Sequence, residues 1–117
     1  MEIIRVKLIG DNEEILVDCK IDNDTNYAAI RKDIAEKIGC LKELRNPPEI
    51  EVEGKTVKPL GVCFLSTEFD NVRTPREAIP VVEDLDYPFI IGGGFIHTYN
   101  IRKENGRYVM DYEPIIW

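Results

Sequence analysis

The densest group of side chains able to do chemistry lies in an acidic turn early in the chain, at residues 22–26. Together with Asp33, this turn places oxygen atoms at several ligand positions of a calcium-binding loop. That loop requires a glycine where Tyr27 stands and a long glutamate where Asp33 stands. The turn therefore does not predict a dedicated calcium site, and its carboxylates remain candidates for acid–base chemistry. Its members are Asp22, Asn23, Asp24, Thr25 and Asn26.

A second feature is the run of glycines at residues 92–94, which follows an apolar segment. Glycine-rich loops that bind phosphate end in Gly-Lys-Ser/Thr or follow the GxGxxG spacing inside a βαβ unit. This run has neither the lysine nor that spacing. We therefore expect a close crossing of two backbone segments here, and no nucleotide or other cofactor.

The cysteines and the histidine give little support for a metal site or a thiol nucleophile. Cys19, Cys40 and Cys63 are odd in number, widely spaced and set among apolar residues, which favours buried free thiols over a disulfide framework. His97 has no second histidine and no cysteine near it in sequence. Neither a zinc site nor a Cys–His pair is predicted.

The first part of the chain predicts a hairpin followed by a helix. Residues 3–9 and 14–21 are β-prone runs separated by a Gly-Asp-Asn turn, which is typical of a β-hairpin. Residues 31–38 carry apolar side chains at helical spacing, and Gly39 stands at the C-cap position. The acidic turn therefore connects a strand to a helix.

The rest of the chain predicts mainly strands. Residues 49–53 alternate polar and apolar side chains, and a strand at residues 56–64 follows a Gly-Lys turn, which predicts a second hairpin. We expect a short strand at residues 79–82 and a short helix at residues 95–99. The Asn-Gly pair at residues 105–106 predicts a further hairpin.

The order of these segments resembles that of the retropepsin-like aspartic proteases. In that family a strand leads into Asp-Thr-Gly-Ala, and Ile30, eight residues after Asp22, matches the Ile or Leu that opens the following helix. The apolar residues and glycine at 88–92, followed by residues 95–101, are similar to the second family signature, and residues 53–61 are similar to its flap-side hairpin. The resemblance runs in order over nearly the whole chain.

The resemblance implies an all-β acid-protease barrel with one or two short helices, a single domain over residues 1–117, and a homodimer. Asp22 matches the catalytic aspartate, whereas the rival Asp18 would need a four-residue insertion before the helix. The implied reaction is cleavage of a peptide bond by a water molecule that two paired aspartates activate. The other implied site residues are Asn23, Asp24 and Thr25 in the active-site loop, Ile90, Ile91 and Gly92 in the second signature, and Val52, Glu53, Gly54, Lys55, Thr56 and Val57 in the flap.

Two departures from the family pattern leave the activity open. Asn23 stands where the family has a threonine that hydrogen-bonds across the dimer axis, and its amide could donate instead. Asp24 stands where the family has glycine, and it adds bulk and a second charge in each copy. Four carboxylates around one axis repel one another and raise the pKa values of the pair. An active endopeptidase and a degenerate dimer that binds a peptide or a cation are both compatible with the sequence.

Charge and composition limit the classes of binding partner. The net charge of −7, without a stripe of Lys and Arg, argues against nucleic acid and membrane surfaces. The N-terminus shows no secretory signal, and no apolar run approaches the roughly 18 residues of a membrane span, so we expect a cytoplasmic protein. The expected partners are a second copy of the chain and a peptide or protein substrate. The apolar residues 114–117 predict a tail that a partner covers.

Overall fold

The first two strands pair into the hairpin that the sequence predicts. In the computed structural model, which describes residues 2–111 of the chain, β1 (Glu2–Ile9) and β2 (Glu14–Ile21) run antiparallel. Successive side chains of a strand point to opposite faces, and so Val17 and Cys19 are buried while Asp18 between them is exposed. The end of β2 leads directly into the acidic turn.

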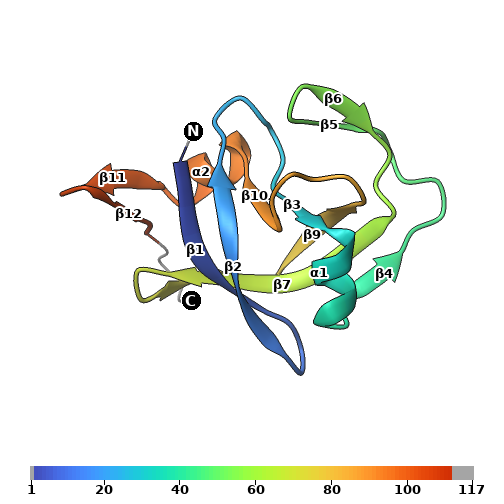
Figure 1. Ribbon diagram of the computed structural model, residues 1–117, viewed down its shortest axis with the longest axis horizontal. Helices are drawn as coiled ribbons and strands as arrows, with labels where there is room; N and C mark the ends of the chain where they lie inside the picture. The colour runs from blue at the N-terminus through green and yellow to red at the C-terminus, as the bar shows by residue number, and fades with distance from the viewer. Residues whose placement is uncertain (1, 112–117) are drawn as a thin grey trace, which may run out of the picture.

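Six strands close into a barrel (Figure 1). From β1 and β2 the ring continues through β10 (Phe89–Ile91), β3 (Ala29–Arg31), β9 (Glu77–Val82) and β7 (Gly61–Phe69), and β7 pairs with β1. β10 pairs with β2 on one side and β3 on the other, and all three of its residues are buried, because Phe89 and Ile91 lie in the main core and Ile90 packs in a second apolar cluster. The predicted all-β barrel is confirmed.

Two short helices flank the barrel. α1 (Lys32–Lys37) matches the predicted helix, and Gly39 just after it has a positive φ of 66°, as expected for a helix-terminating glycine. α2 (Gly93–Thr98) begins two residues before the helix predicted at residues 95–99. Neither helix in residues 2–111 is long and apolar enough to cross a membrane.

The remaining strands are short. The predicted single strand at residues 56–64 is wrong, because it breaks around Pro59, which lacks the N–H that a ladder needs. The hairpins expected near residues 49–57 and 101–110 are confirmed. The apolar tail predicted at residues 114–117 lies outside the described residues. The additional strands are β4 (Leu41–Glu43), β5 (Ile50–Val52), β6 (Lys55–Val57), β8 (Val72–Arg73), β11 (Arg102–Glu104) and β12 (Arg107–Val109).

The buried apolar side chains form two clusters. The larger one fills the barrel and includes Leu8, Ile30 and Phe89. The smaller one lies beneath the β5–β6 hairpin, which we call the flap. It consists of Ala29, Ile50, Val52, Val82, Leu85 and Ile90, with Val57 packed against it. The flap is therefore held down on the barrel by its own apolar side chains.

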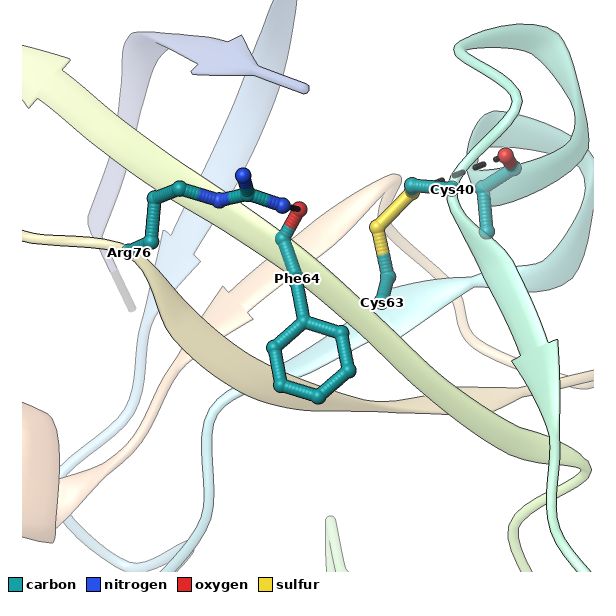
Figure 2. The surroundings of a disulfide bond; sticks show 5 residues. Cys40, Cys63, Phe64 and Arg76 are labelled. Carbon is teal, nitrogen blue, oxygen red and sulfur yellow. Dashed lines mark hydrogen bonds between the residues drawn. A yellow bond between two sulfur atoms is a disulfide. The ribbon is translucent and has the colours of Figure 1, made fainter. Parts of the chain in front are cut away.

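Cys40 and Cys63 form a disulfide, so the prediction of three free thiols is wrong for these two (Figure 2). Cys40 follows α1, and β4 pairs with β7 so that Leu41 lies opposite Cys63, which brings the two Cα atoms within 4.9 Å. The ladder that creates this proximity is not visible in the cysteine spacing. Cys19 is free and buried, as predicted, and burial raises the pKa of its thiol.

We expect the disulfide to stabilise the fold, because it closes a loop with a sequence separation of 23 residues that includes the flap. Replacing both cysteines with alanine should lower the free energy of unfolding by about 3 kcal/mol, as measured by urea denaturation. A reductant should destabilise the wild-type chain and a Cys19→Ala variant, but not the double variant. A wild-type chain that is insensitive to reductant would contradict this expectation.

Candidate active site

The acidic turn is fixed to the end of β10 and the residues that follow it. The backbone N–H of Asp22 donates to the carbonyl oxygen of Ile91 at 3.0 Å, and the N–H of Gly93 donates to the carbonyl oxygen of Thr25 at 2.5 Å. The parallel pairing of β2 with β10 brings the ends of both strands to this point. The two segments that resemble the family signatures, about 70 residues apart, therefore meet in space.

The close approach of two backbone segments explains why glycine stands at position 92. A Cβ atom at this position would lie 2.5 Å from the carbonyl oxygen of Tyr27 and 2.6 Å from that of Thr25. These oxygens belong to backbone, which cannot move aside without disturbing the turn. The close backbone crossing predicted for residues 92–94 is therefore confirmed.

The carboxylate of Asp22 is held by donors on both oxygens. Oδ1 accepts the backbone N–H of Asp24 at 3.0 Å, and Oδ2 accepts the hydroxyl of Thr25 at 3.1 Å. The ammonium group of Lys20 lies 3.6 Å from Oδ2. The side chain of Asp22 is only 15% exposed, so its orientation is well defined by these three groups.

These contacts determine the charge of Asp22. Burial raises its pKa, but the Asp24 N–H, the Thr25 hydroxyl and the Lys20 ammonium favour the ionised form and together hold the pKa below its usual value. A single copy of the chain therefore carries an ionised Asp22 at neutral pH. A second carboxylate brought close to it would raise the pKa of the pair.

The tip of the flap rests on the same turn. The backbone N–H of Glu53 donates to the Thr25 hydroxyl oxygen at 3.1 Å, and Lys20 Nζ donates to Glu53 Oε2 at 2.7 Å. Thr25 is 2% exposed and uses its hydroxyl both as donor and as acceptor. In Figure 1 the β5–β6 hairpin accordingly leans toward the loop that follows β2.

The other residues of the predicted site differ in exposure. Asn23 and Asp24 lie at the surface of the turn, and Asp24 does not have a positive φ, so the backbone accepts this replacement of glycine without strain. Ile90 and Ile91 are fully buried in β10. Asp18 lies in the middle of β2, with its side chain 56% exposed and 3.9 Å from Arg5.

A pocket of about 420 Å³ opens beside the carboxylate of Asp22. No group of three or more metal-binding side chains lies together within residues 2–111. The charged side chains of Lys20, Asp22 and Asp24 in its lining offer acid–base groups and ionic contacts. Its lining residues are Glu2, Lys20, Ile21, Asp22, Asn23, Asp24 and Tyr108.

The sequence analysis missed the role of Lys20. Residues two apart in a strand share a face, so a lysine two positions before Asp22 at the end of a predicted strand was a usable signal. Glu53 was assigned to the flap, but its contact with Lys20 spans 33 residues and depends on how the hairpin folds over the turn. That contact could not be predicted from spacing.

The barrel, the fixed aspartate turn and the flap together define the retropepsin-like fold. The chain is similar to the crystal structure of the retroviral protease-like domain of Ddi1 from Leishmania major, with a TM-score of 0.64, 14% identity, and coverage of 97% of this chain and 96% of that one. It is also similar to a retropepsin-like aspartic protease from Rickettsia conorii, with a TM-score of 0.58, 19% identity, and coverage of 94% and 83%. No protein-family model and no curated protein matches the sequence. At these identities the likeness shows the fold alone.

The depressed pKa of Asp22 predicts a change in the pH dependence of stability. Because this pKa is lower in the folded than in the unfolded chain, ionised Asp22 stabilises the fold above about pH 4. This contribution to the unfolding free energy is lost as the pH falls through the pKa of Asp22 in the folded chain. Asp22→Asn should therefore flatten the dependence of the unfolding free energy between about pH 5 and pH 2. Urea denaturation at several pH values measures this slope.

The matched control is Asp18→Asn, which removes an exposed carboxylate from β2 whose surface ion pair with Arg5 contributes little to stability. This variant should keep the slope of the wild-type chain. Identical slopes for the Asp22→Asn variant and the wild-type chain would show that the contacts of Asp22 do not stabilise its charge.

Proposed function

We propose that the chain is a homodimeric aspartic endopeptidase in which Asp22 and its counterpart in a second copy form the catalytic pair. The observation that carries this proposal is the position of Asp22. It lies where the turn after β2 meets the segment after β10, and both of its carboxylate oxygens are held by donors. The likeness of the fold to retropepsin-like domains supports the same assignment.

In the proposed reaction the two carboxylates share one proton. The ionised aspartate takes a proton from a water molecule that attacks the peptide carbonyl carbon, and the protonated one donates to the carbonyl oxygen. Collapse of the tetrahedral intermediate then releases the amine with a proton from the pair. Because Lys20 and Thr25 stabilise the ionised form of each Asp22, we expect the singly protonated pair to form on the acid side of neutrality.

The proposed substrate is an extended peptide that lies between the flap and the turn. A peptide strand in such a position pairs through its main chain and places alternate side chains in pockets. A cavity of about 100 Å³ between the flap and the segment after β9 provides one candidate pocket. It is lined by Val52, Glu53, Lys55, Val57, Val82, Asp84, Leu85 and Asp86.

A second candidate function is a dimer that binds a peptide without cleaving it. Two observations favour it: the exposed carboxylate of Asp24 adds a charge near each Asp22, and the ammonium of Lys20 lies beside Asp22. The Lys20 ammonium stabilises the ionised form of Asp22 and so disfavours a shared proton, whereas the Asp24 side chain adds bulk where the family's glycine leaves room for the substrate. Recovery of an uncut peptide bound at the site would support this alternative.

The cytoplasmic location stays a prediction. Disulfides persist in oxidising compartments and inside hyperthermophilic cells, but are rare in other cytoplasms. The Cys40–Cys63 disulfide is therefore a reason to determine the redox state of both cysteines in the native cells.

Peptide hydrolysis between pH 3 and pH 7 tests the proposed function. The wild-type chain should cleave a mixed peptide library, and Asp22→Asn should reduce the rate by about 10³-fold, because acid–base catalysis is lost. Asp18→Asn is the matched control and should retain activity. Cleavage that survives Asp22→Asn would overturn the assignment of the catalytic residue, and a stable dimer that cleaves nothing would favour the binding function.

A further inference from the structure

The flap in this structure leaves no room for a peptide. A strand that pairs with an element on each side lies about 4.8 Å from each of them, so the two elements must be separated by roughly 10 Å. Here the flap tip and the turn are in direct contact: the Glu53 N–H lies 3.1 Å from the Thr25 hydroxyl, and the Glu53 carboxylate lies 2.7 Å from Lys20 Nζ. The structure is therefore a closed form from which a substrate is excluded.

Lys20 joins the flap to the catalytic carboxylate. Its ammonium group binds Glu53 Oε2 at 2.7 Å and lies 3.6 Å from Asp22 Oδ2, and the side chains of Lys20 and Glu53 are each 16% exposed. A charge-assisted hydrogen bond with so little access to solvent is stronger than an ordinary surface ion pair. The Glu53 bond raises the pKa of Lys20, which keeps the ammonium charged at neutral pH.

The backbone at the flap tip supports a specific role for Glu53. Glu53 and Gly54 both have positive φ values, of 54° and 75°, as the two central residues of a type I′ hairpin turn do. Asn or Gly suits the first of these positions, and a glutamate there is unfavourable for the turn itself. The geometry of the turn therefore does not account for a glutamate at position 53, whereas the contact of its side chain with Lys20 does.

We propose that Lys20 is a positioning residue that latches the flap over Asp22 through Glu53, and that a peptide must break this ion pair to enter. The proposal rests on the proposed function only in taking the space beneath the flap as the substrate site. The same side chain has two roles: it holds the flap in the closed form, and it places a positive charge beside Asp22. When the flap opens, the Glu53 carboxylate moves away from Lys20, and the Lys20 ammonium then interacts with Asp22 alone.

Hydrogen exchange of the flap amides in the full-length chain tests the latch without any need for turnover. Glu53→Gln and Lys20→Met should each accelerate exchange at residues 50–57 by about tenfold, because the charge-assisted bond is lost. Exchange in β1 and β2 should stay at the wild-type rate, which shows that the barrel remains folded. Unchanged exchange of the flap in Glu53→Gln would overturn the proposal.

Two further variants separate the ion pair from the turn preference at position 53 and from the apolar packing of the flap. Glu53→Asn gives the turn its preferred Asn-Gly pair but removes the carboxylate, so the flap should still exchange faster. The double variant Lys20→Glu with Glu53→Lys reverses the ion pair and should restore most of the protection. Slow exchange in Glu53→Asn, or no recovery in the double variant, would show that apolar packing of the flap and not the ion pair keeps it closed.

The double variant also separates the two roles of Lys20. It restores the ion pair but places a carboxylate beside Asp22, which should raise the pKa of Asp22 in an NMR titration while the flap stays protected. If the pKa of Asp22 stays at its wild-type value, Lys20 does not act on the carboxylate. Absence of peptide cleavage together with the predicted exchange pattern would disprove the proposed endopeptidase and leave the latch standing.

Discussion

The backbone contact between the turn at residues 22–26 and the segment at residues 91–94 is the constraint on which the site depends. The polar backbone of this turn is next to a barrel of apolar side chains, so its N–H and carbonyl groups need partners. The end of β10 and the residues that follow it supply them, through Ile91, Gly93 and Gly94. Only glycine at position 92 allows the two segments to approach this closely. The position of Asp22 follows from the way the barrel closes.

The same contact determines the environment of the carboxylate and of the flap. Because the turn is fixed, the hydroxyl of Thr25 is directed at Asp22 and also accepts the N–H of the flap tip. Lys20, near the end of β2 and two residues before Asp22, then lies within reach of both Asp22 and Glu53. One short segment therefore couples the charge of Asp22 to the conformation of a hairpin from a distant part of the chain.

The local structure was largely predictable from the sequence, whereas contacts between distant segments were not. The hairpin turns and the helix before Gly39 follow from local preferences that the fold preserves. The glycines at residues 92–94 indicated a close backbone crossing, but not which segment they cross. The Cys40–Cys63 disulfide and the Lys20–Glu53 ion pair depend on which strands become neighbours, and neither spacing nor residue type fixes that. The replacement of the family glycine by Asp24 is structurally tolerated, since its φ is not positive.

The central claim is that two copies of the chain bring their Asp22 turns together at a two-fold axis. Oxidative cross-linking of an Asn23→Cys variant tests it most directly, because Asn23 is exposed beside Asp22 and a disulfide forms only between cysteines whose Cα atoms approach within about 7 Å. The account predicts rapid formation of a covalent dimer by Asn23→Cys and none by Asp18→Cys, which lies on the exposed face of β2. Cross-linking of Asn23→Cys no faster than that of Asp18→Cys would contradict it.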